Sequence, residues 1–481
     1  MPTQWYLRME AVNLGNFVYD TEDLSTIRGG GHLLLSAVNT VAAKHKESLE
    51  KISSGASVGL FAVKEGIDHN KAVGDVRNSL NDDENFKHAT FVVNAVQATT
   101  DYPKDRERVI AANRWQQMRS LSIAVPSDKG SSQVCEVDMI RPAVERDSKG
   151  MISRATFQRR QKGIDNKQSN SSKGNRSRFY QEISGHEVQG FFVNNLDEMT
   201  SDENNPLHHK MAVIYVDGNG FGKIQNDKCK ERTLHEAFDK YLADQYKDLK
   251  AQLLKKIDSD PRWLNSEDSY RLETLLWGGD ERMWVVPAWK GWELLQFFFD
   301  VSRDWRFGDT RLTHAAGIVF CHHKAPIHRI TALARGLADE AKGKSRKRNV
   351  FAYQVLESFD HVGRDLAGFR NERCPVGEHV HSLVLSGSDM KQIAKSMETL
   401  RSSEFPTSRL HRTISALLAP DEASRAMADE LIKELRTKLQ QSDPGAENEL
   451  KQLESKLGGP RTMWVHLAEL WNYASLPEVQ P

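Results

Sequence analysis

The sequence has few cysteines. Cys135, Cys229, Cys321 and Cys374 are the only four among 481 residues. No two of them stand at a close paired spacing, so neither a disulfide framework nor a complete zinc knuckle can be read from them. This usage fits a reducing compartment, and we expect a cytoplasmic protein.

Long apolar runs and an excess of charge are missing as well. No window approaches the ~20 apolar residues of a membrane span, and the first ten residues contain no signal-peptide core. Lys plus Arg and Asp plus Glu both total 66, so no global field attracts nucleic acid or a membrane. Any polyanion site must therefore be local. The length leaves room for roughly three domains.

The clearest predicted domain covers residues 206–360. Apolar, β-branched runs predict strands, and apolar residues at helical spacing predict helices between them. The order is β-α-β-β-α-β with one extra element, which is the ferredoxin-like arrangement. The predicted strands are Met211–Val216, Arg271–Trp277, Arg282–Val286, Leu312–Phe320 and Val350–Val355, and the predicted helices are Thr233–Ile257, Trp292–Asp304 and Ile327–Lys342.

Residues 1–127 predict a related but weaker domain without an acidic turn. Its Glu10, on the first strand, is interpreted as a residue at the sheet edge. Residues 361–481 predict a small helical domain, for which partner docking stays open. The predicted elements are the strands Trp5–Val12, Ser57–Val63, Thr90–Val96 and Leu121–Val125, and the helices Leu24–His45, Ser388–Arg401, Thr407–Leu418, Asp421–Gln440 and Met463–Ala474.

Residues 128–205 form a basic, polar insertion or linker between the two ferredoxin-like domains. Arg159-Arg160-Gln161-Lys162 and Asn166–Arg178 carry most of its positive charge. Contact with RNA or phosphate and a solvated insertion without function are both open. The predicted fold class is α+β, with two βαββαβ domains, an insertion and a carboxy-terminal helical domain.

Two carboxylate sites in residues 206–360 point to chemistry. Asp217 ends the first strand, and Gly278-Gly279-Asp280-Glu281 forms the turn between the second and third strands. A Gly-Gly-Asp-Glu turn by itself is typical of an ordinary hairpin. In this topology, however, the strand end and the hairpin tip lie side by side, so that Asp217 and Asp280 can share a divalent cation.

A glycine-rich loop follows Asp217 and predicts a phosphate cradle. Its alternating glycines let backbone amides approach an anion, and Phe221 is predicted to anchor the loop in the core. Lys342 is predicted to reach a triphosphate as a point charge, or else only to stabilise its helix end. The predicted nucleotide-binding residues are Gly218, Asn219, Gly220, Phe221, Gly222, Lys223, Gly278, Gly279 and Lys342, the catalytic residues are Asp217, Asp280 and Glu281, and the metal ligands are these three and Gly218 through its carbonyl.

Nucleotidyl transfer explains the need for these carboxylates. A 3′-hydroxyl must lose its proton while the α-phosphate gains charge, and two Mg²⁺ or Mn²⁺ ions roughly 3.5–4 Å apart stabilise both changes. Hard oxygen ligands suit such ions.

Histidines gather at two further places. Cys321-His322-His323 and His328 follow a predicted strand, and His208-His209 precede another. One thiol beside histidines, without a second spaced pair, is typical of a surface loop. We interpret the first group as such a loop and His208-His209 as a solvated turn.

In the segments around Asp217 and the Gly-Gly-Asp-Glu turn, and in Phe17–Leu35, the chain resembles the large subunit of type III CRISPR effector complexes. This is the palm-domain family that makes cyclic oligoadenylates. Phe17–Leu35 is similar to part of that family's amino-terminal palm. The resemblance implies two palms, a zinc-bearing insertion and a helical carboxy-terminal domain, with ATP polymerised at the second palm. It also implies effector-complex subunits and guide or target RNA as partners, and it leaves a homo-oligomer open. The segments similar to the second palm are Tyr215–Lys223, Gly278–Glu281, Ala315–Val319, Ala325–Ile327 and Ala341-Lys342.

Three departures from that family bear on function. The family's hairpin usually ends in Asp-Asp, whereas Glu281 is nearer the Gly-Gly-Asp-Glu-Phe turn of the related diguanylate cyclases. Asp138 and Arg141-Pro142-Ala143 stand after Cys135 where further cysteines are expected, so zinc is not predicted. No His-Asp dipeptide occurs and the palm-like pattern starts near residue 5, so the nuclease domain of many members is not predicted.

The leading hypothesis is a metal-dependent nucleotidyltransferase that makes cyclic oligonucleotide second messengers in antiviral defence. A catalytically silent scaffold subunit of an RNA-guided complex is the first alternative. A cyclic dinucleotide synthase that uses GTP is the second, and it is weakened because residues 273–277 lack the arginine of the usual inhibitory site.

Overall fold

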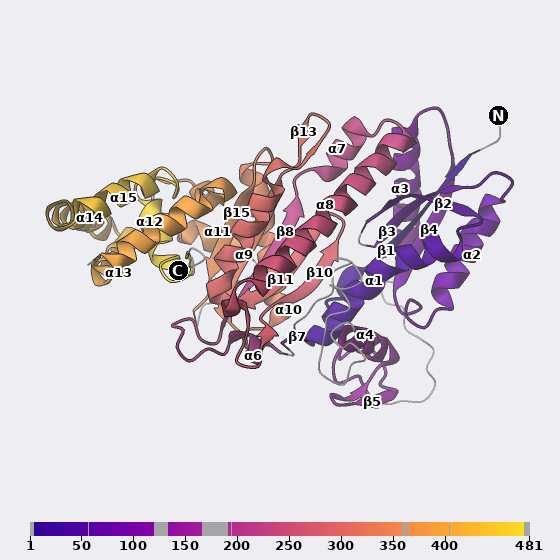
Figure 1. The fold of residues 1–481 in the computed structure, drawn as a ribbon, viewed down its shortest axis with the longest axis horizontal. Helices are drawn as coiled ribbons and strands as arrows, with labels where there is room; N and C mark the ends of the chain where they lie inside the picture. Colours follow the sequence, from indigo (N-terminus) through magenta and orange to yellow (C-terminus); the bar gives the residue numbers. More distant parts are fainter. Residues whose placement is uncertain are drawn as a thin grey trace.

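The computed structural model describes residues 4–55, 57–119, 133–165, 191–193, 195–357, 362–363, 365–403 and 405–475. The molecule is elongated, with one sheet near the amino terminus, a second sheet in the middle and helices at the far end (Figure 1). Within the described ranges, no helix has both the length and the apolar character needed to span a bilayer. The predicted α+β fold class is confirmed.

The first sheet, with its helices, is the first palm. Its strand order is β2-β3-β1-β4 with antiparallel neighbours, the pattern of a ferredoxin-like domain. Helices α1 and α2 pack on one face, and α3 packs on the other. The elements are β1 (Trp5–Val12), α1 (Leu24–Lys44), β2 (Leu49–Ser54), β3 (Val58–Val63), α2 (His69–Asn81), β4 (Thr90–Gln97) and α3 (Tyr102–Arg119).

For the first palm, the expectation for Glu10 is corrected, and the expectation of a strand at Leu121–Val125 stays a prediction. Glu10 does not lie at the sheet edge, because β1 is flanked by both β3 and β4. Its carboxylate is buried and pairs with Arg8 at 3.1 Å and Arg114 at 3.0 Å. The predicted strand Leu121–Val125 lies outside the described residues.

The insertion after the first palm is folded over residues 133–165 rather than being a linker there. It contains β5 (Glu145–Asp147), β6 (Gly150–Ile152) and α4 (Arg154–Asp165). Arg159 is fully buried and pairs with Asp20 at 2.5 Å, and Arg160 pairs with Asp23 at 2.8 Å. These two cations are therefore not free for RNA. The predicted basic segment 166–178 lies outside the described residues.

Asp138, which stands where the similar family has a further cysteine, organises this insertion. Its carboxylate accepts hydrogen bonds from the backbone amides of Ile140 and Arg141 at 2.9 Å each. The hydroxyls of Ser153 and Thr156 donate to it at 2.9 and 2.8 Å. Burial opposes ionisation, but these hydrogen bonds prevail and lower the pKa of Asp138 to about 2.

Helix α1 joins the insertion to the second palm. A Cβ added at Gly29 would lie 1.7 Å from the carbonyl oxygen of Arg159, so α1 and α4 meet where only glycine fits. On another face of α1, Arg28 forms a two-pronged pair with Glu273 on the second sheet, at 2.6 and 2.5 Å. Both side chains of this pair are 4% exposed.

The second sheet, with its helices, is the second palm. Its order is β10-β11-β8-β14-β15-β16, and its first four strands repeat the ferredoxin-like order. Alternate residues of β8 enter the cores on the two faces, one containing α8 and α9 and the other α10. The elements are β8 (Lys210–Gly218), α7 (Phe221–Lys228), α8 (Arg232–Asp258), β10 (Glu273–Gly278), β11 (Glu281–Pro287), α9 (Ala288–Val301), β14 (His314–His322), α10 (Ile327–Lys344) and β15 (Val350–Val355).

The carboxy-terminal helices share a core with the second palm. Residues of α12 and α16 pack in the same apolar cluster as those of α8 and α9. Strand β16 also extends the second sheet by pairing with β15. The domain boundary predicted between residues 360 and 361 would divide this sheet, and it stays a prediction. The elements are α11 (Leu366–Glu372), β16 (Val384–Ser386), α12 (Met390–Ser402), α13 (Thr407–Leu417), α14 (Glu422–Ser442), α15 (Pro444–Glu454) and α16 (Thr462–Glu469).

Candidate active site between the two palms

Three carboxylates converge at one end of the second sheet. Strand β11 lies between β10 and β8, so the turn that joins β10 to β11 sits beside the last residues of β8. The register pairs Arg282 with Val216, which places Glu281 next to Asp217. Gly279, with a φ of 52°, takes the left-handed conformation that the tight turn requires.

The carboxylates repel one another in a poorly solvated place. Burial raises the pKa of Asp280 to about 7, and the negative charge of Asp217 adds to this shift. Burial likewise raises the pKa of Asp217, against the opposing effect of Lys342. A cation placed between them would relieve both the repulsion and the desolvation. The donor set therefore fits a divalent metal ion with hard oxygen ligands.

One cation and one phenol already contact two of these carboxylates. Lys342, near the end of α10, forms an ion pair with Asp217. The hydroxyl of Tyr215 donates a hydrogen bond to Glu281. Next to them, the Arg335 guanidinium lies over the rings of Tyr19 and Tyr215, at 4.3 and 5.3 Å. Lys342 is thus held at the carboxylate site, and does more than end a helix.

The glycine-rich loop leads into α7. Phe221 is buried against Phe238, and a Cβ on Gly218 would lie 2.7 Å from its ring, so Phe221 does anchor the loop. The amide of Asn219 donates to the Thr313 carbonyl at 2.8 Å, which removes it from the predicted phosphate cradle.

The remaining amides of the cradle belong to the start of α7. Gly220, with a φ of 69°, caps this helix without a side-chain hydrogen bond. The amides of Phe221, Gly222 and Lys223 precede the first intrahelical donor, Ile224. Such a helix start favours an anion.

A cavity of about 640 Å³ lies between the two palms. The start of α7, the face of α8 and the Gly-Gly-Asp turn form one wall, and β2, β3, α1 and α3 form the other. Of the predicted residues, Phe221, Gly222, Gly278, Gly279 and Asp280 line it. Asp217, Gly218, Asn219, Gly220, Lys223, Glu281 and Lys342 are not among the lining residues.

Basic side chains of both palms line this cavity, and the sequence analysis missed them. They are Arg8 and Arg106 from the first palm, and Lys247, Lys250 and Arg282 from the second. Burial, with the charge of Arg282 as a second cause, lowers the pKa of Lys250 to about 6. One signal was available, since Lys247 and Lys250 stand three residues apart and therefore share a helix face.

Arg282 fixes the shape of the acidic turn. Its guanidinium lies 3.4 Å from the centre of the Tyr246 ring and 4.7 Å from that of Trp277. It donates to the carbonyls of Gly278 and Gly279 at 3.1 and 3.0 Å. The turn is therefore held in place before any ligand binds.

Residues 210–352 match the family model described as Cas10/Cmr2, second palm domain. The chain is Cas10-like. This match covers β8 to β15 and includes all three carboxylates. No curated protein matches the sequence.

Solved structures extend the likeness of the Cas10-like chain to its full length. Csm1 from T. onnurineus is 14% identical with a TM-score of 0.57, and the match covers 98% of this chain and 69% of that one. A Csm1–Csm4 cassette in complex with cA4 is 11% identical with a TM-score of 0.56, and the match covers 98% of this chain and 69% of that one. A Csm1–Csm4 cassette in complex with pppApApA is 12% identical with a TM-score of 0.56, and the match has the same two coverages, 98% and 69%. At these identities the matches show a shared fold.

Proposed function

We propose that this protein is a metal-dependent nucleotidyltransferase that joins nucleoside triphosphates, with ATP preferred, into cyclic oligonucleotide second messengers for antiviral defence. One observation carries the proposal. Asp217, Asp280 and Glu281 meet beside a cavity that both palms line with cations. An acidic metal site next to a basic cavity is the arrangement that nucleotide polymerisation needs.

The carboxylates and the Gly218 carbonyl are the proposed ligands of Mg²⁺ or Mn²⁺. When bound, a pair of such ions would activate the 3′-hydroxyl and stabilise the pyrophosphate leaving group. Lys342, now paired with Asp217, would offer its positive charge to a triphosphate. The amides at the start of α7 would accept a phosphate, and the cations of the cavity would orient the second nucleotide.

The choice of ATP rests on similar proteins. Csm1–Csm4 cassettes of this fold have been solved with cA4, with one ATP, with AMPPNP and with pppApApA. The Glu281 side chain differs from the usual second aspartate of that family, so product size and base preference are part of the test. On the same likeness, we propose a second subunit of an effector complex and guide or target RNA as partners.

The test incubates the purified chain with each α-labelled nucleoside triphosphate, with Mg²⁺ or Mn²⁺, and with and without RNA. We expect labelled oligonucleotides from ATP in the wild type and none from the Asp217→Asn, Asp280→Asn double variant. The matched control is Asp227→Asn, an exposed carboxylate on α7 in the same palm. Equal product from the double variant would refute the proposal. No product from any nucleotide, with or without RNA and a Csm4-type partner, would favour the scaffold, and turnover of GTP alone would favour the dinucleotide synthase.

A further inference from the structure

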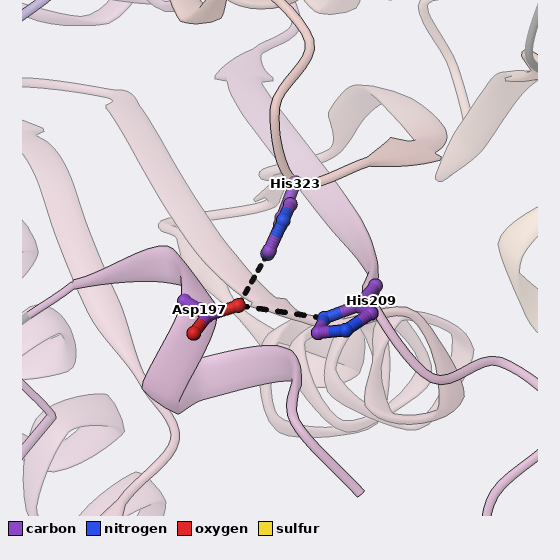
Figure 2. A group of neighbouring side chains, drawn as sticks. All are labelled: Asp197, His209 and His323. Atoms are coloured by element: carbon purple, nitrogen blue, oxygen red, sulfur yellow. Dashed lines mark ion pairs between the residues drawn. The ribbon is translucent and has the colours of Figure 1, made fainter. Parts of the chain in front are cut away.

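Two histidines and an aspartate from three separate segments face one another at the end of the second sheet opposite to the carboxylates. Figure 2 shows Asp197 of α6 (Leu196–Thr200), His209 just before β8, and His323 just after β14. They meet because β8 and β14 are antiparallel neighbours, with Lys210 opposite His322.

This arrangement corrects the surface-loop interpretation for Cys321 and His323, whereas His209 is partly exposed, as in the predicted solvated turn. Cys321 and His323 are buried, and the His209 and His323 rings lie 4.8 Å apart. His208-His209 and His322-His323 therefore form one cluster, which residue spacing alone did not reveal, whereas His328 pairs with Glu22.

The two distances from Asp197 to the histidines suit a shared ion better than hydrogen bonds. The Asp197 Oδ1 atom is 3.4 Å from Nδ1 of His323 and 3.5 Å from Nδ1 of His209. Normal N–H···O hydrogen bonds are shorter, at roughly 2.7–3.2 Å. Two ligands on one tetrahedral zinc ion, with bonds of about 2.0–2.2 Å, lie about 3.3–3.5 Å apart. One candidate ligand atom from each of the three residues lies within 4.8 Å of the others.

His209 is held in place without a hydrogen bond to its ring nitrogen. Its φ of 63° is in the left-handed region, which a non-glycine residue seldom adopts. Its amide donates to the Thr200 carbonyl and its carbonyl accepts from the amide of His323, both at 2.9 Å. Its Nδ1 atom is buried and makes no hydrogen bond. A strained backbone and an unsatisfied ring nitrogen are the features of a residue kept for a ligand.

His323 has one competing contact. Its Nδ1 atom is 3.1 Å from the Thr200 hydroxyl, which itself lies 2.8 Å from the Leu196 carbonyl. The hydroxyl can donate to that carbonyl and leave the nitrogen's lone pair for an ion. If instead His323 keeps a proton on Nδ1, the cluster is only a polar contact, and the experiment below separates the two cases.

We propose that Asp197, His209 and His323 bind a divalent transition-metal ion of the Zn²⁺ class, with water at the fourth position. Imidazole suits zinc rather than Mg²⁺, and Asp197 is 69% exposed, so water can reach the site. His209, just before β8, and Asp217, near the end of that strand, are eight residue steps apart, which is about 26 Å. The ion would tie the segment that leads out of the insertion to two strands of the second palm. It is a different place from Cys135, where zinc was not predicted.

The probe is Co²⁺ added to the full-length, metal-stripped protein, with Zn²⁺ as competitor and Mg²⁺ in excess to occupy hard oxygen sites. We expect one equivalent to give the visible absorption of a tetrahedral site, and Zn²⁺ to abolish it. Asp197→Asn, at an exposed position that should not disturb folding, should weaken binding at least tenfold, and His323→Asn should do the same. Glu203→Gln, an exposed carboxylate in the turn that follows α6, is the matched control and should bind normally.

Two further measurements make the outcome decisive. Binding should survive in the Asp217→Asn, Asp280→Asn double variant, because those carboxylates belong to another site. Zn²⁺ should also raise the Tm of the wild type and of Glu203→Gln, but not that of Asp197→Asn. No bound equivalent in the wild type, or equal affinity in Asp197→Asn and Glu203→Gln, would overturn the proposal. Both readouts are independent of nucleotide turnover.

Discussion

Asp280→Asn should make the metal-free protein more stable at neutral and alkaline pH. Burial first, and then the charge of Asp217, raise the pKa of Asp280 from 3.8 to about 7. A carboxyl whose pKa is raised on folding favours the folded state below its unfolded pKa, and this contribution is lost as pH rises to the folded pKa. An ionised Asp280 thus weakens the fold at pH 8, whereas asparagine has no charge to bury.

The full shift corresponds to about 4 kcal/mol at 1.36 kcal/mol per pKa unit. Asp280 is partly exposed, and solvent screens its charge, so we expect about 2 kcal/mol. Urea denaturation without divalent ions should show this gain for Asp280→Asn at pH 8, and the gain should shrink through pH 6 and vanish near pH 4.

Metal ions should reverse the order of stability. With Mn²⁺ present, the wild type gains binding free energy at the carboxylates and the variant gains much less. Asp227→Asn, which removes an exposed charge from the same palm, should change stability little at any pH. A variant that is less stable than the wild type at pH 8 without metal, or a difference that does not vary with pH, would refute the reasoning.

Three further predictions concern packing and charge. Lys342→Gln should raise the KM for ATP at least tenfold in steady-state assays, since it removes the cation at Asp217, whereas an unchanged KM would refute a contact between Lys342 and the triphosphate. Arg28→Met should lower the free energy of unfolding by about 3–5 kcal/mol because it takes the buried cation away from buried Glu273, and adding Glu273→Gln should restore much of this loss in urea melts. Gly29→Ala should destabilise by about 2 kcal/mol or more by forcing α1 away from α4, whereas Gly74→Ala in α2, with nothing within 4 Å, should be neutral or stabilising by thermal melting.

Much of the second palm could be predicted because its pattern is strong. β8, the acidic hairpin, α10 and β15 are marked by apolar runs and glycines, and the observed bounds differ by only a few residues. Strand β2, which reads Leu-Glu-Lys-Ile-Ser-Ser, was missed because its two apolar residues, Leu49 and Ile52, stand three apart and enter opposite cores, so the sequence shows no strand-like alternation.

The parts of the site that escaped prediction depend on contacts distant in sequence. Arg159 read as a linker cation, but it is buried because Asp20 lies beside it. His209 and His323 were assigned to separate turns, and only the pairing of β8 with β14 unites them. The basic lining of the cavity likewise needs Arg8 and Lys250 from different palms. Local sequence contains the elements, whereas their mutual placement comes from tertiary packing.

Helix α1 has a consequence beyond its own palm. One of its faces is pressed against the insertion at Gly29, and Arg28 fastens it to Glu273, five residues before Gly278. Helix α1 therefore contacts both the insertion and the strand that leads into the acidic turn. A displacement of the insertion would be transmitted to this turn by a helix and not by a flexible loop. A second palm produced without α1 would lose the buried guanidinium that faces Glu273, so the first palm also contributes to the stability of the sheet that holds the acidic turn.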